Sequence, residues 1–323
     1  MTDLHDLVVA LDLGGTKFRV ALVNRDGDIL KRSIAATDAH EGRKQVLQRV
    51  NDLIHETMRE TGATIIGMGI SVPGPLDPEK GIIMHPPNLP NWEHVPIRDL
   101  CEKEFGIPVY AGNDANMAAV GEHRYGAGKG VSHLVYITVS TGIGGGVIIN
   151  NKLYLGSRGL AGEVGHMTVD PDGPLCNCGN SGCLEALASG TSIARRAAER
   201  IAAGEMSSLA SLVKEDPRRL TAEAVELAGR SGDTLAKAVL EEAGRYLGMG
   251  VANLIHCFDP EMVVIGGGVS RAGDAIISPV RREVEKRLMP AFKDSVAIVP
   301  AVLGENTGLL GAATMAFGQA GAI

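Results

Sequence analysis

Two segments, far apart in the chain, repeat one pattern: an apolar run, a glycine-rich turn and a second apolar run. Leu7 to Leu11 is followed by the turn Asp12-Leu13-Gly14-Gly15-Thr16-Lys17, the first glycine loop, and by Phe18 to Val23. About 128 residues later, Leu134 to Val139 is followed by Ser140-Thr141-Gly142-Ile143-Gly144-Gly145-Gly146, the second glycine loop, and by Val147 to Asn150. Short apolar runs bounded by glycine predict buried strands. Two such units predict a duplicated α/β architecture that holds a ligand between its halves.

The rest of the chain alternates helical and strand patterns. Between Gly42 and Thr61 an apolar residue recurs every fourth position, which predicts a helix. Residues 77–97 are rich in proline and asparagine and are interpreted as an ordered loop or short hairpin. The remaining expected strands are 65–72, 109–111 and 262–265, and the remaining expected helices are 113–125, 186–203, 221–228, 234–257 and one after Asn306.

Composition excludes several classes of protein. The 323 residues carry a net charge of -7, which gives nucleic-acid binding no electrostatic support. The polar start of the chain does not resemble a signal peptide, and the longest apolar stretch is broken by glycines, so we expect no membrane span. Five cysteines, three of them at metal spacing, predict a reducing, cytoplasmic location. Cys101 and Cys257 are expected to be buried.

Four potential metal ligands lie close together in the sequence. Cys176, Cys178 and Cys183 place three thiols within eight residues, and His166 precedes Cys176 by ten residues. Three cysteines and one histidine complete the closed shell of a structural zinc site. Glu163 and Glu185 flank these ligands, so a zinc ion would fix two carboxylates that can accept hydrogen bonds from a polyol.

Both glycine loops could hold an anion. In the first loop, Gly14 and Gly15 let backbone N–H groups approach a phosphate, and Thr16 and Lys17 add donors. Asp12 is suited to hold Mg²⁺ through water. In the second loop, Thr141 and Gly142 would contact a nucleotide phosphate. A plain hairpin, or a tight bend between crowded strands, is the alternative for each loop.

Two further segments carry candidate residues. Asn113-Asp114 stands where a strand meets a helix start, so Asp114 is either a general base or a helix cap. Gly267 and Gly268 follow the strand 262–265 and would let an adenine or ribose lie against the backbone. A simple strand-to-helix turn is the alternative for these two glycines.

Taken together, these residues resemble the ROK family of bacterial sugar kinases and repressors along nearly the whole chain. The first glycine loop matches the family's first phosphate motif, and the second loop, from Thr141 to Gly146, matches its second. Asn113-Asp114-Ala115-Asn116 matches its catalytic motif. Gly162-Glu163-Val164-Gly165-His166 and Cys176 to Glu185 match its signature, zinc ligands included. The second loop departs mildly, with Ile143 where many members have threonine.

The resemblance implies an actin/hexokinase-like fold of two α/β lobes with a cleft between them. The smaller lobe would be residues 1–117, with a C-terminal helix at about 305–323 packing back on it, and the larger lobe 118–304. The sugar would contact a set of residues drawn from both lobes: Gly74, Asn88, Asn113, Asp114, Glu163, His166 and Glu185. Asp114 is implied as the base.

The implied activity is ATP-dependent phosphorylation of a hexose at its 6-hydroxyl, most similar to the glucokinase branch, with ATP, Mg²⁺ and structural Zn²⁺. A homodimer or homotetramer is expected by resemblance. The alternatives are a kinase for N-acetylmannosamine, fructose or another hexose, a polyphosphate-dependent glucokinase, and a sugar-sensing repressor. A repressor needs a DNA-binding arm, for which we expect no room before Asp12.

Overall fold

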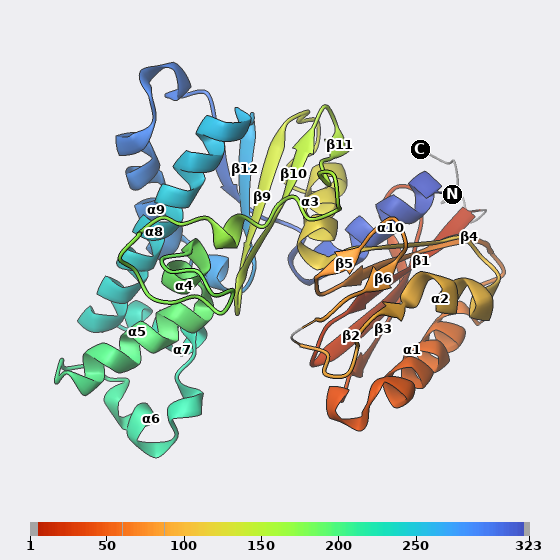
Figure 1. The fold of residues 1–323 in the computed structure, drawn as a ribbon, viewed down its shortest axis with the longest axis horizontal. Helices are drawn as coiled ribbons and strands as arrows, with labels where there is room; N and C mark the ends of the chain where they lie inside the picture. The colour runs from red at the N-terminus through yellow and green to blue at the C-terminus, as the bar shows by residue number, and fades with distance from the viewer. Residues whose placement is uncertain (1–5, 60, 87, 320–323) are drawn as a thin grey trace. The chain divides into compact units, whose positions relative to one another are not determined.

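The computed structural model describes residues 6–59, 61–86 and 88–319 (Figure 1). Contacts within the chain divide it into two compact units. The first unit comprises residues 1–130, 146–162 and 302–323, and the second comprises residues 131–145 and 163–301. The predicted lobe boundary at 117 falls inside a helix, α3 (Asp114–Tyr125), and the lobe division itself stays a prediction.

A five-stranded sheet in the order β3-β2-β1-β4-β8 forms the centre of the first unit. Its first three strands are antiparallel neighbours: β1 (Asp6–Leu13), β2 (Lys17–Val23) and β3 (Ile29–Ala36). On the other side of β1, β4 (Thr64–Val72) and β8 (Val109–Asn113) continue the sheet in parallel. The first glycine loop therefore joins two strands, as the sequence predicts, and the structure shows that these strands are antiparallel.

Helices cover both faces of this sheet. Successive residues of a strand point to opposite faces of the sheet. Val9 therefore packs in one core with helices α1 (Arg43–Met58) and α2 (Ile97–Phe105). Val8 packs in a second core, on the other face, with helix α10 (Thr307–Gln319). Helix α10 also lies against α3, and a Cβ on Gly311 would overlap the carbonyl of Met117. Burial on both faces explains why the sequences of β1 and β4 are almost continuously apolar, whereas the edge strand β3 is partly exposed and carries charged residues.

A small antiparallel sheet occupies the segment predicted as a loop or hairpin. It consists of β5 (Leu76–Asp77), β6 (Ile82–Ile83) and β7 (Val95–Pro96). Trp92, the only tryptophan, is fully buried in the core next to β7. The segment is thus fixed by packing as well as by its turns.

A second five-stranded sheet has the order β11-β10-β9-β12-β13. Its strands are β9 (Leu134–Val139), β10 (Ile143–Ile149), β11 (Lys152–Leu153), β12 (Met262–Gly266) and β13 (Ala297–Pro300). Strand β12 runs parallel to both β9 and β13. The second glycine loop joins β9 to β10, which repeats the arrangement of the first loop between β1 and β2.

Helices of the second unit are α4 (Leu184–Ala188), α5 (Gly190–Ala202), α6 (Ala210–Glu215), α7 (Ala222–Arg230), α8 (Thr234–Phe258) and α9 (Asp274–Arg287). The single helix predicted for 186–203 is wrong, because Ser189 is extended and its hydroxyl accepts the N–H of Ser192 as the N-cap of α5. Cys101 is buried as expected, but Cys257 is exposed. No helix within the described ranges is long and apolar enough to cross a membrane.

Candidate functional site

Three parallel strands of the first unit bring most of its predicted site residues to one edge. The register places Asp12 of β1 beside Ser71 of β4, and Val72 of β4 beside Asn113 of β8. The carboxyl ends of parallel strands meet at the same edge of a sheet, where ligands of α/β proteins usually bind. The first glycine loop, Gly74 and Asp114 follow these three strand ends.

Close contacts, one with backbone and one with a side chain, link the remaining loops of this edge. A Cβ on Gly15 would stand 2.6 Å from the carbonyl oxygen of Asn88, so the Asn88 loop lies against the first glycine loop. A Cβ on Gly74 would stand 2.6 Å from Nδ2 of Asn113. Glycine is needed at both positions for the loops to come this close. In the first unit, Asn88 therefore lies against the first glycine loop, and Gly74 lies against Asn113.

Asp12 is held by two partners at this edge. Arg19 donates from Nη1 to Oδ2 at 2.8 Å, and the Ser71 hydroxyl donates to Oδ1 at 3.1 Å. Burial raises the pKa of Asp12, while Arg19 and Ser71 act in the opposite direction. Lys17 lies nearby on the surface, with Nζ 3.5 Å from Oε1 of Glu305. An exposed pair of this kind contributes about 0–1 kcal/mol, so Lys17 is readily available to a phosphate.

Asn113, and not Asp114, is the N-cap of α3. Its Oδ1 accepts the N–H groups of Ala115 at 3.0 Å and Asn116 at 3.3 Å. Asp114 is the first helical residue, is exposed, and accepts the Ala115 N–H at 2.8 Å. A carboxylate at a helix N-terminus is stabilised in its charged form by the helix dipole. The charged form is the one that can accept a proton.

The second unit contains the predicted metal cluster. His166, Cys176, Cys178 and Cys183 offer ligand atoms that all lie within 4.8 Å of one another. Nδ1 of His166 is 3.7 Å from Sγ of Cys176, and Sγ of Cys178 is 3.6 Å from Sγ of Cys183. Tetrahedral zinc with bonds of about 2.3 Å to sulfur separates its ligand atoms by about 3.8 Å. The donor set and the spacing both fit a structural zinc ion.

Glu185 connects this cluster to the second glycine loop. Its Oε2 accepts the N–H of Ile143 at 2.8 Å, and its Oε1 lies 3.9 Å from Sγ of Cys176. A Cβ on Gly142 would overlap Glu185, and one on Gly165 would overlap the carbonyl of Ile143. Glu163 is more exposed, with Oε2 3.9 Å from Nε2 of His166. The zinc cluster, the second loop and both glutamates therefore belong to one packed arrangement.

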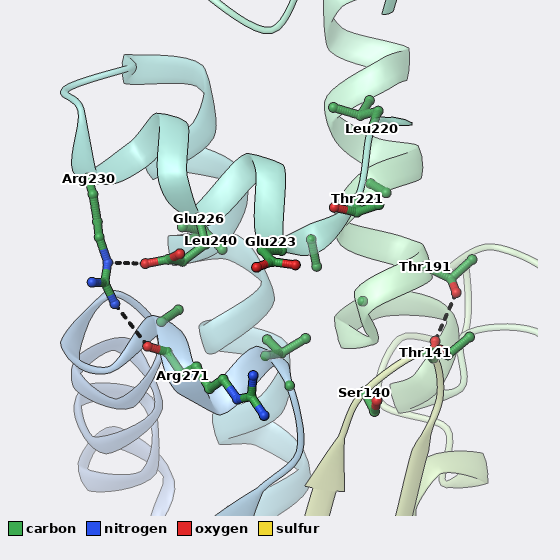
Figure 2. A pocket seen from close by; sticks show the side chains of 16 residues that line it. Ser140, Thr141, Thr191, Leu220, Thr221, Glu223, Glu226, Arg230, Leu240 and Arg271 are labelled. Carbon is green, nitrogen blue, oxygen red and sulfur yellow. Dashed lines mark hydrogen bonds and ion pairs between the residues drawn. The ribbon is translucent and has the colours of Figure 1, made fainter. Parts of the chain in front are cut away.

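A cavity of about 560 Å³ opens beside the second glycine loop (Figure 2). Thr141 lines it, and its carbonyl accepts the hydroxyl of Thr191 at 2.9 Å. Gly268 lines it too, with open space where a Cβ would stand. Gly267 has a φ of +85°, and a Cβ there would overlap the carbonyl of Val139, so only glycine fits.

Several residues of this cavity were not found from the sequence. Thr191 lies in the first turn of α5, Glu223 and Arg230 lie on α7, and Arg271 follows β12. They come from three separated segments, and none belongs to a motif with its own chemistry. Only the packing of these elements brings them together.

Comparison with known proteins identifies the family. The model of the ROK family matches residues 8–319. A glucokinase of Thermotoga maritima is 41% identical over 308 residues, covering 95% of this chain and 96% of that protein. The structure of a ROK family glucokinase from Streptomyces griseus in complex with glucose and AMPPNP has a TM-score of 0.82 and 35% identity, covering 96% of this chain and 99% of that one. A xylose repressor of Caldicellulosiruptor bescii is 33% identical over 311 residues, covering 95% of this chain and 77% of the repressor.

These matches confirm the predicted class, a mixed α/β fold of the actin/hexokinase-like type. The chain belongs to the ROK family. The resemblance inferred from the glycine loops and the cysteine cluster is therefore confirmed.

Proposed function

We propose that this chain transfers the γ-phosphate of ATP to the 6-hydroxyl of glucose. The observation that carries the proposal is its similarity, along nearly its whole length, to glucokinases, one of which binds glucose and AMPPNP. The first glycine loop and Asn113-Asp114 support the same conclusion, because phosphoryl transfer needs a backbone that cradles phosphate and a base for the attacking hydroxyl.

The sugar would be held by carboxylates, amides and one imidazole. In the second unit we assign Glu163, His166 and Glu185 to this role, and in the first unit Asn113 and Asp114, together with Gly74 and Asn88. Carboxylates accept hydrogen bonds from hydroxyl groups, and adjacent hydroxyls of a hexose need several acceptors in fixed positions. Zinc would supply rigidity here, because its closed ligand shell leaves no position for the substrate.

Asp114 would act as the general base. Its carboxylate takes the proton of the 6-hydroxyl while the hydroxyl oxygen forms a bond to the γ-phosphorus, and the bond from that phosphorus to the bridging oxygen of ADP breaks. The products are glucose 6-phosphate, ADP and a proton on Asp114 that is later released to water. The exposed position of Asp114 at the start of α3 leaves its carboxylate accessible to a substrate.

ATP would be held by glycine-rich segments of both units. We assign its phosphates to the first glycine loop, from Gly14 to Lys17, and to Thr141 and Gly142, and its nucleoside to the cavity beside Gly267 and Gly268. Mg²⁺, when bound with ATP, neutralises phosphate charge, and Asp12 would hold it through water. Arg19 and Ser71 orient Asp12 for this role.

A coupled assay of ADP release tests the function. Purified protein with ATP is supplied with glucose, N-acetylmannosamine, fructose and mannose in turn, with a reaction lacking sugar as the background. We expect the highest kcat/KM with glucose. A higher value with another sugar would move the assignment to that hexose, and replacing ATP by polyphosphate tests the alternative donor.

A sugar-sensing repressor is the second candidate. It is favoured by the similarity to the xylose repressor, and by a TM-score of 0.87 to a ROK family transcriptional regulator at 27% identity. A repressor without kinase activity would bind sugar and release no ADP in the same assay. The homodimer or homotetramer and the cytoplasmic location remain predictions, which light scattering and cell fractionation would test.

A further inference from the structure

The cavity beside the second glycine loop has walls of different character (Figure 2). Leu220, Leu240, Val269 and Ala272 provide buried apolar surface. Ser140 and Thr141 belong to the glycine loop and provide polar groups. An apolar wall suits the flat face of a base, and the loop suits phosphate, so a nucleotide lying across the cavity would place its ribose between them.

Two glutamates of α7 face this cavity, and they differ in their partners. Glu226 forms an ion pair with Arg230, whose guanidinium also donates to the carbonyl of Arg271 at 3.0 Å. Figure 2 shows Glu226 turned toward Arg230, whereas Glu223 points away from that pair. Glu223 is exposed and makes no hydrogen bond or ion pair with the residues that the structure describes. The charge of Glu226 is therefore compensated within the protein, and that of Glu223 is not.

The chemistry of Glu223 limits what it can bind. An ionised carboxylate only accepts hydrogen bonds, and its charge repels a phosphate. A ribonucleotide offers it two adjacent hydroxyl donors at C2′ and C3′, which match the two oxygens of a carboxylate. A polyphosphate chain offers no donor of this kind.

We propose that Glu223 is a specificity-determining residue that accepts hydrogen bonds from the 2′- and 3′-hydroxyls of the donor nucleotide. The assignment rests on the proposed kinase function and deepens it, since it defines the donor as a ribonucleotide. Glu226, held by Arg230, forms the wall behind this position.

Nucleotide binding to the full-length, zinc-loaded protein with glucose present provides the test. Dissociation constants are measured by titration calorimetry for ADP, 2′-deoxyADP and 3′-deoxyADP. The wild type should bind ADP about 10-fold more tightly than either deoxynucleotide, because each lacks a hydrogen bond to a charged group. Glu223→Ala should weaken ADP binding about 100-fold, because both hydrogen bonds are lost, and each deoxynucleotide about 10-fold, because each still has one hydroxyl to lose, so that the preference disappears. Glu285→Ala, at an exposed glutamate of α9 outside the cavity, is the matched control and should retain the preference.

Three results would overturn the assignment. A wild type that does not distinguish the three nucleotides excludes recognition of the ribose hydroxyls. A Glu223→Ala variant that loses affinity equally for all three would place Glu223 against the base or in a purely structural role. If no nucleotide binds and no ADP is released with any sugar, the kinase function fails together with this assignment, whereas the first two results leave the kinase function intact.

Discussion

At the scale of single residues, His166 turns its two ring nitrogens to different neighbours. Nδ1 lies 3.7 Å from Sγ of Cys176, and Nε2 lies 3.9 Å from Oε2 of Glu163. A histidine that gives one nitrogen to a metal keeps a proton on the other, and a carboxylate near that proton fixes the orientation of the ring. The same side chain therefore joins the zinc cluster to the group of residues proposed to hold the sugar.

The assignment of Asp114 as base makes a prediction about turnover. Asp114→Asn keeps the size of the side chain and removes its ability to take a proton. Since a general base typically contributes about 10²–10⁴ in rate, kcat should fall by that factor while KM for glucose changes little. Steady-state kinetics with glucose and ATP measure both quantities.

The matched control is Asp99→Asn, because Asp99 is also an exposed aspartate in the first turn of a helix, α2. It should keep wild-type kcat. Ordinary turnover by Asp114→Asn would contradict the role of Asp114 as base, provided that circular dichroism shows both variants folded.

At the scale of elements, the sequence predicts local structure best where a single segment determines it. The glycine loops were found because apolar runs and glycines lie next to one another. The break between α4 and α5 was missed, because it depends on one side chain, Ser189, that caps the second helix. Glu122 is fully buried, and it accepts N–H groups from Val302 and Leu303. Those two donors are about 180 positions away in the chain, beyond the reach of any sequence pattern.

The same limit applies to the candidate site. The zinc cluster could be predicted because three cysteines and one histidine at metal spacing rarely occur by chance in a short segment. Glu223 could not, because an acidic residue in a helix is usually solvated, and only the fold places it in a cavity with Thr141. A functional site can be predicted when its residues lie close together in the sequence. It cannot be predicted when only the fold brings its residues together.

Asp233 gives a prediction about one helix and its dependence on pH. It caps α8, accepting the N–H of Ala236 at 2.9 Å and that of Ser208 at 2.6 Å. Burial raises the pKa of Asp233, but these hydrogen bonds together outweigh burial and lower the pKa to about 2, from 3.8. A carboxyl whose pKa is lower in the folded state than in the unfolded state stabilises the protein at pH values above the unfolded-state pKa. This contribution is lost as the pH falls through the folded-state pKa.

Asp233→Asn should therefore lower the free energy of unfolding by about 1–2 kcal/mol at pH 7, a value reduced for partial exposure. Asparagine caps helices nearly as well as aspartate, so the loss comes mainly from the charge. Urea denaturation between pH 7 and pH 2.5 should show the difference between variant and wild type shrinking below pH 4. A difference that is the same at every pH would show that the charge of Asp233 has no part in it.

At the scale of the whole molecule, the two units differ in what holds them together. The sheet of the first unit is packed between two apolar cores that need no metal. In the second unit, the segment from His166 to Cys183 contains almost no regular structure and only isolated bridges, such as Thr168 with Cys183. Its shape therefore depends on the four clustered ligands, and we expect loss of zinc to affect the two units unequally.

Cys178→Ser tests this expectation, since Cys178 is exposed and its substitution removes a ligand with little loss of packing. Zinc content by mass spectrometry should fall well below one ion per chain, and Tm should fall by about 10 °C, because closed zinc sites contribute folding energy directly. Cys257→Ser, at the exposed cysteine of α8, should change neither quantity.

Hydrogen exchange should rise between residues 163 and 202 in the Cys178→Ser variant, while the amides of β1 and β4 stay protected. Equal deprotection of both units would mean that zinc stabilises the chain as a single cooperative body, and unchanged zinc content would exclude Cys178 as a ligand.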